Sequence, residues 1–190
     1  MRMSFYKICF LVAIAANLSL VFISDTAAAQ VWATESGHAA FVSSMPLFEF
    51  TGESEYLAGR ISFPDSTLDF YLDLESLKTG IGKRDKDMRQ TLGTKKNPFA
   101  EFYGRLHGAI DPTSDNSYPV TAIGDFSING VTRPVTITGE IKVSGETLIL
   151  SASWILRLGD YNIEPPKLLI FKVDEDQRIT ITATLQRISE

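Results

Sequence analysis

Cysteine and histidine are scarce in this 190-residue chain, whose residues of these two types are Cys9, His38 and His107. One cysteine can form no internal disulfide, and so few thiols and imidazoles exclude a Cys/His zinc site. The sequence also lacks a glycine-rich phosphate loop and the nucleophile turn of a serine hydrolase. These absences predict a protein with no catalytic residues, no metal site and no cofactor.

Basic residues are also fewer than acidic ones: the chain has 18 Lys and Arg and 23 Asp and Glu, which gives a net charge of −5. A chain with this balance repels polyanions on average, so we expect no nucleic-acid partner. Hydrophobic residues make up 44% of the chain and charged residues 22%. This composition is typical of a folded domain with a substantial core and excludes wholesale disorder.

The first 29 residues have the three parts of a secretory signal peptide. They are two basic residues, an apolar stretch and a small-residue cleavage site: Arg2 and Lys7, residues 8–23, and Ala27, Ala28 and Ala29. The apolar stretch is shorter than the roughly 20 residues that span a bilayer. We therefore expect a periplasmic or secreted protein in which residues 30–190 form one domain, with a net charge of −6 and no transmembrane anchor.

After residue 30, apolar and polar residues alternate in many short segments, which is the pattern of half-buried β-strands. The pattern is clearest in residues 67–75, 120–128, 135–143 and 179–185, and further strands are expected in 38–43, 56–63, 99–106, 147–156 and 168–173. Regularly spaced strands without repeated helices favour an all-β antiparallel sandwich or barrel.

Two local signals add detail to this architecture. Residues 81–92 carry apolar side chains at helical spacing and are followed by Gly93, so they predict one short helix. Asn129 and Gly130 separate two alternating runs and predict a type I′ hairpin, whose two central residues both need positive φ. Pro134 has no N–H and is expected at a strand start or edge.

Large apolar residues recur on one face of the predicted strands. They are Leu68, Phe70, Leu72, Phe102, Phe126, Leu150 and Trp154, and we expect all of them to point inward. Such rows usually fill a packed core. A closed sheet of about eight strands can instead leave a cavity for one small ligand, and the rows alone do not decide between these two interiors.

Basic residues concentrate around the predicted helix, giving that segment a local charge of +4 in an acidic protein. They are Lys83, Arg84, Lys86, Arg89, Lys95 and Lys96, with Asp85 and Asp87 among them. A solvated helix face is one interpretation. The other is a site for an anionic head group, for which Arg84 and Arg89 are our candidates.

Three stretches carry a family resemblance in their order and spacing: residues 84–89 (Arg-Asp-Lys-Asp-Met-Arg), 97–102 (Asn-Pro-Phe-Ala-Glu-Phe) and 126–136 (Phe-Ser-Ile-Asn-Gly-Val-Thr-Arg-Pro-Val-Thr). They resemble the YceI-like family, and the similarity extends over about residues 36–188. This resemblance implies a lipocalin-like antiparallel barrel crossed by a helix and exported to the periplasm. It also implies a polyisoprenoid or other lipid as ligand, and a homodimer as one assembly.

Together these observations predict a non-enzymatic barrel that carries or sequesters a lipid-like molecule. The ligand-binding residues would be the seven inward-facing residues together with Arg84 and Arg89. Two alternatives remain open at this point. One is a hydrolase or isomerase that acts on an apolar substrate in the same interior, and the other is a structural or stress-related envelope protein whose barrel is packed shut.

Overall fold

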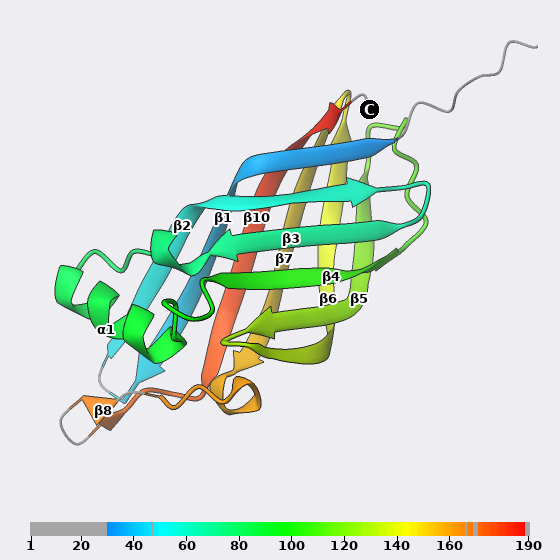
Figure 1. Ribbon diagram of the computed structural model, residues 1–190. Coiled ribbons are helices and arrows are strands. Elements are labelled where there is room, and N and C mark those ends of the chain that lie inside the picture. The colour runs from blue at the N-terminus through cyan, green and yellow to red at the C-terminus, as the bar shows by residue number, and fades with distance from the viewer. Residues whose placement is uncertain (1–29, 47, 166, 169–170, 189–190) are drawn as a thin grey trace, which may run out of the picture.

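Eight long antiparallel strands close into a barrel in the computed structural model, which describes residues 30–190 except 47, 166, 169–170 and 189–190. The predicted signal segment lies outside the described residues. The order around the barrel is β1-β10-β7-β6-β5-β4-β3-β2, and β1 closes the sheet against β10 (Figure 1). The strands are β1 (Val31–Met45), β2 (Phe48–Ser62), β3 (Thr67–Asp73), β4 (Phe99–His107), β5 (Ser117–Ile128), β6 (Val131–Ser144), β7 (Thr147–Arg157) and β10 (Asp176–Ile188). The predicted all-β antiparallel barrel is confirmed.

Three of the strand predictions need correction. The segment 168–173 is not a barrel strand, because it contributes to two short strands, β8 (Lys167–Leu168) and β9 (Phe171–Lys172), that pair only with each other. The strands β1 and β2 are each 15 residues long and extend well beyond the predicted 38–43 and 56–63. Their pairing contains register shifts, which interrupt the simple alternation that the prediction used.

The predicted helix is present as α1 (Gly82–Leu92), between β3 and β4. It ends at Gly93, which adopts the left-handed conformation at φ 65° and donates its N–H to the last turn. Two 3-10 turns, η1 (Leu74–Ser76) and η2 (Leu158–Tyr161), lie near the same end of the barrel (Figure 1). No helix among the described residues has both the length and the hydrophobicity to cross a membrane.

The hairpin between β5 and β6 has the predicted geometry. Asn129 and Gly130 have φ values of 54° and 73°, so both central residues are in the positive region that a type I′ turn requires. A side chain on Gly130 would also meet the Asn97 amide oxygen at 3.0 Å. The positive φ therefore favours glycine at this position, and a side chain there would also have to displace the Asn97 amide.

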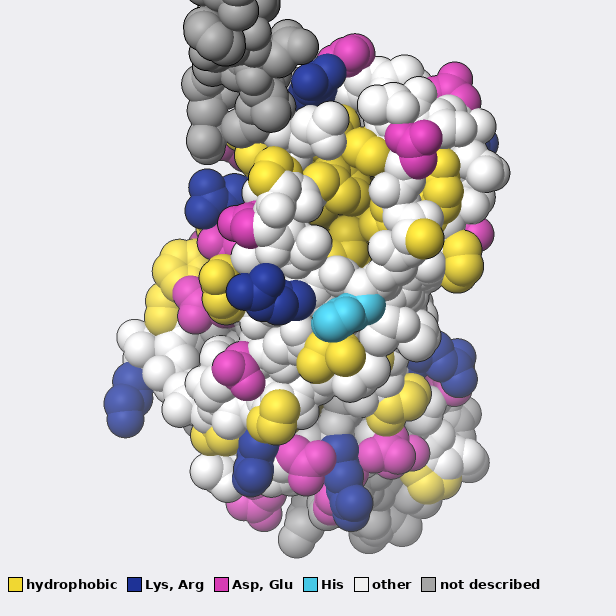
Figure 2. Space-filling view, turned by 90° about the vertical axis from the view of Figure 1, so that its right-hand side faces the viewer, with side chains coloured by type: hydrophobic (Ala, Val, Ile, Leu, Met, Phe, Trp, Pro, Cys, Tyr) yellow, Lys and Arg dark blue, Asp and Glu magenta, His cyan; other side chains and the backbone are white. Residues whose placement is uncertain are grey.

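The end of the barrel opposite α1 is filled by apolar side chains. We call this group the plug: Trp32, Ile61, Ile141, Val143, Leu148 and Leu185, each at most 2% exposed. Ring contact between Trp32 and Phe63, at 5.0 Å between centroids, adds to the packing at the start of β1. Figure 2 shows the side of the molecule that lies to the right in Figure 1, with hydrophobic side chains gathered in the upper part of the view among polar and charged ones. This half of the barrel is a conventional packed core.

The barrel wall is incompletely paired between β6 and β7 on the side of α1. The ladder between these strands reaches Thr138 and Ser153, and no ladder pair of the described residues continues it between 131–137 and 154–157. We call this gap the β6–β7 seam. Residues 131–137 pair only with β5 there, and Pro134 is one of them, so its expected position at an edge is confirmed.

Hydrogen bonds from β6 and its hairpin hold the η2 region across the seam. The Nε of Arg133 donates to the backbone carbonyl of Asp160 at 3.0 Å. The side-chain amide of Asn129 donates to the backbone carbonyls of Tyr161 at 3.2 Å and Asn162 at 3.4 Å. At the seam, side-chain hydrogen bonds therefore hold the wall together in place of a backbone ladder.

Candidate ligand cavity

A cavity of about 1050 Å³ occupies the half of the barrel nearest α1. All eight barrel strands contribute inward-facing residues to it, and α1 and the η2 region cover its end. Its lining is mostly aliphatic and aromatic. The sequence left open whether the barrel interior is packed or hollow. In the structure it is packed at the plug and hollow beneath α1.

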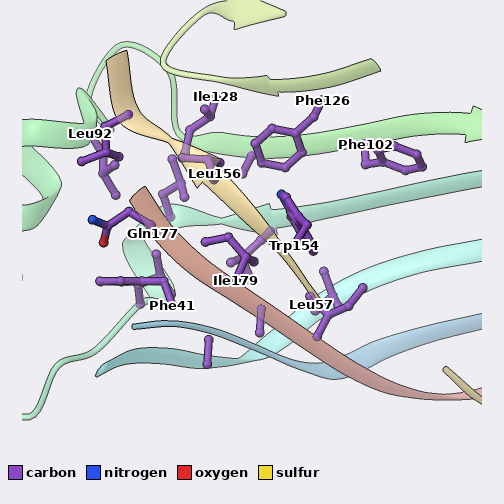
Figure 3. Close-up of a pocket in the computed structure, with 18 of the residues that line it drawn as sticks. Phe41, Leu57, Leu92, Phe102, Phe126, Ile128, Trp154, Leu156, Gln177 and Ile179 are labelled. Carbon is purple, nitrogen blue, oxygen red and sulfur yellow. The ribbon is translucent and has the colours of Figure 1, made fainter. Parts of the chain in front are cut away.

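The seven apolar residues predicted to point inward all line this cavity: Leu68, Phe70, Leu72, Phe102, Phe126, Leu150 and Trp154. Figure 3 shows Phe102, Phe126 and Trp154 projecting into the same space from three different strands. The rings of Phe126 and Trp154 meet edge to face with centroids 5.9 Å apart. The Tyr161 ring contacts Phe126 at 5.7 Å, and burial raises the pKa of the Tyr161 phenol.

The inward residues of β7 show how far the cavity extends along the barrel. From the plug toward the α1 end, they are Leu148, Leu150, Ala152, Trp154 and Leu156, and all but Leu148 line the cavity. The rise along an antiparallel strand is about 3.4 Å per residue, so Leu150 to Leu156 spans roughly 20 Å. The outward residues between them include Ile149 and Ile155, which are exposed to solvent.

Several lining residues were not singled out from the sequence. Phe41 and Phe50 contact each other at 6.1 Å, and Met88, Leu92 and Ile163 complete the apolar end. Met88 and Leu92 had a usable signal, since they supply the apolar positions of the predicted helix. Phe41 and Phe50 lie in the regularly paired stretch of β1 and β2 beyond the register shifts, but burial does not alternate cleanly along β1 there, so the sequence did not mark the inner face.

A few polar groups interrupt the apolar lining. Gln177 lines the cavity although it is only 5% exposed, and its Nε2 donates to the backbone carbonyl of Asp174 at 2.7 Å (Figure 3). Ser43, at the far end of β1, is also buried in the lining. No group of three or more His, Cys, Asp or Glu side chains within the described ranges is arranged to hold a metal ion.

Arg84 lies at the α1 side of the cavity and contributes to its lining. Its Nη2 donates to the backbone carbonyl of Thr79 at 2.6 Å, and its guanidinium lies 4.5 Å from the centroid of the Phe50 ring. The Nε is buried and has no hydrogen-bond partner among the described residues. The structure thus places one predicted cation where the apolar interior meets the helix.

Arg89 does not accompany Arg84. Its Nε lies 3.3 Å from a carboxylate oxygen of Glu75, its Nη2 donates to the Glu75 backbone carbonyl at 3.1 Å, and it is not part of the lining. The Thr94 hydroxyl donates to the same Glu75 carboxylate. Arg84 and Arg89 therefore do not lie together in the cavity lining, because the Glu75 carboxylate holds Arg89 toward η1.

The start of α1 is tied to the preceding loop by Asp85, which is buried. One of its carboxylate oxygens accepts hydrogen bonds from the Thr79 N–H at 2.7 Å and from the Thr79 hydroxyl at 2.5 Å. These bonds lower the pKa of Asp85 below its usual value, since they favour the charged form. Next along the helix, Lys83 and Asp87 form an exposed pair at 2.7 Å beside the cavity.

Comparison with known proteins agrees with this geometry. A structure of a polyisoprenoid binding domain from Saccharophagus degradans, implicated in plant cell wall breakdown, superposes with a TM-score of 0.69 at 15% identity, covering 84% of this chain and 99% of that one. BcnA from Burkholderia cenocepacia superposes with a TM-score of 0.63 at 17% identity, covering 78% and 95%. At these identities the likeness establishes the fold.

The sequence comparisons carry the relationship further. A UPF0312 protein of Shewanella denitrificans is 30% identical over 100 residues, which is 52% of this chain and 49% of that protein. The chain thus aligns with about half the length of this relative. Residues 25–185 match the YceI-like domain, a span that includes every barrel strand but the last three residues of β10. The chain belongs to the YceI-like domain family.

Proposed function

We propose that this protein is an exported, non-enzymatic binding protein that carries or sequesters a lipid-like molecule, such as a polyisoprenoid, in the cavity beneath α1. The observation that carries the proposal is the cavity of about 1050 Å³ with its predominantly apolar lining. Contact between water and such a surface is unfavourable in free energy, so an apolar chain that displaces the water is stabilised by the hydrophobic effect. A structural relative described as a polyisoprenoid binding domain supports this class of ligand.

The ligand would lie with its apolar chain along the seven predicted inward residues and its polar end near α1. Arg84 supports this orientation, since its buried Nε lacks a partner and a charged or polar head group could accept its hydrogen. Arg89 has no part in this proposal because Glu75 already pairs with it. The signal-like residues 1–29 support export, and the proposed location is the periplasm or the outside of the cell.

Native mass spectrometry of protein purified gently from its own source tests this function. We expect a stoichiometric lipid that organic extraction removes and that an added polyprenol restores. Trp154→Ala alters the cavity wall and should weaken rebinding, whereas Ile155→Ala, its exposed neighbour on the outer face, should not. Protein that carries no lipid and takes up no polyprenol after extraction would contradict the proposal.

A further inference from the structure

The cavity has a closed floor. Leu150 and Leu68 line it, whereas their cross-strand partners Ile141 and Ile61 belong to the plug and are fully buried. In each of these two pairs, one residue therefore lines the cavity and its partner belongs to the packed plug. A chain that enters from the α1 side stops where it meets these side chains.

The closed floor gives the cavity a finite capacity. A carbon group in a liquid takes up about as much space as a water molecule, roughly 30 Å³, so the cavity holds on the order of 35 carbon atoms. This corresponds to about seven isoprene units. Any further part of the chain would have to lie outside the cavity, where it gains nothing from the apolar lining.

A pair of small residues lies halfway up the cavity wall. Gly139 on β6 and Ala152 on β7 are cross-strand partners, and both line the cavity. A Cβ on Gly139 would meet the Ser151 carbonyl oxygen at 2.4 Å and the Ala152 Cβ at 3.0 Å, so this position has no room for a side chain. Ala152 is the member of the pair from which a larger side chain would extend into the hollow.

From these observations, and resting on the proposed function, we propose that the protein selects its ligand by size, with a limit of about 35 apolar carbons. The plug sets the floor, and Ala152 is a specificity-determining residue because its small side chain leaves the middle of the cavity open. A phenyl ring at this position would take the space of about one isoprene unit.

The test uses lipid-free protein and a mixture of polyprenols with three to eleven isoprene units, with bound species quantified by native mass spectrometry. For the wild type, we expect binding to strengthen with length up to about seven units and then to level off. Ala152→Phe should level off about one unit earlier. Ser153→Phe, which adds the same ring to the exposed outer face of β7, should match the wild type.

Each outcome bears on the proposal. A wild type whose affinity keeps rising to eleven units, or an Ala152→Phe protein that levels off at the wild-type length, would overturn the size limit while leaving lipid binding intact. Failure of every polyprenol to bind would instead overturn the proposed function, and the size limit with it. If circular dichroism shows that Ala152→Phe is unfolded, Ala152→Leu provides a smaller reduction of the same space.

Discussion

Truncation of a plug residue should destabilise the protein far more than truncation of a cavity residue on the same strand. Leu148 is 0% exposed in the plug, while Leu156 is 5% exposed and lines the cavity. A buried Leu→Ala change in a packed core costs about 2.7–5 kcal/mol, because a new void adds to the lost transfer free energy. Leu156→Ala enlarges a void that already exists, so we expect a loss of about 1–2 kcal/mol.

Urea and thermal unfolding of lipid-free protein measure this difference. For a domain of this size, 1 kcal/mol corresponds to roughly 2–4 °C, so Leu148→Ala should lower Tm by roughly 5–20 °C and Leu156→Ala by roughly 2–8 °C. Ile149→Ala, at 41% exposure on the outer face, is the matched control and should change Tm least. Equal losses for Leu148→Ala and Leu156→Ala would refute the division of the barrel into a packed half and a hollow half.

Three further perturbations test other parts of the structure. Phe126→Asp places an unpaired carboxylate in the apolar lining and should cost on the order of 3–5 kcal/mol or abolish lipid uptake; wild-type behaviour in both a melt and an uptake assay would contradict the inward position of Phe126. Gly130→Val forces a β-branched residue to φ 73° and should lower stability by about 1–3 kcal/mol, more than Arg133→Ala weakens lipid binding. An unchanged melting temperature for the valine variant would contradict the need for positive φ at this turn. The pKa of Asp85 is lowered in the folded state, so its contribution to stability is complete above the unfolded value near 3.8 and disappears as the pH falls through the lower folded value. Asp85→Asn should therefore reduce the urea midpoint at neutral pH, and its deficit should shrink as the pH falls below the unfolded value; a deficit independent of pH would contradict the role of the charge.

The sequence predicted the barrel well where one face of a strand is buried and the other is wet. Residues 67–75 and 120–128 are examples, since a strict period of two is the direct consequence of a half-buried strand. The helix was equally readable from its apolar spacing and Gly93. The prediction failed for 168–173, because a short apolar run carries no information on whether it joins the barrel or forms a separate hairpin.

The interior was less accessible to prediction. Leu148 and Leu150 are identical residues in adjacent inward positions, yet one fills the plug and the other lines a cavity. The difference depends on which side chains of other strands lie opposite each residue, which the local sequence does not encode. Arg84 and Arg89 were indistinguishable for a related reason, because only the folded chain brings the Glu75 carboxylate to one of them and the cavity to the other.

At the β6–β7 seam, the described barrel wall has no backbone hydrogen bonds between the two strands along part of its length. Because no backbone ladder of the described residues joins β6 to β7 there, separating the seam releases the hydrogen bonds that the Arg133 and Asn129 side chains donate to three carbonyls. Local opening at the seam should therefore cost less than opening between laddered strands, and amide hydrogen exchange should be faster in 131–137 than in the fully laddered half of β6. The wall beside the cavity can in this way widen for a bulky guest without unfolding the plug that keeps the rest of the barrel rigid.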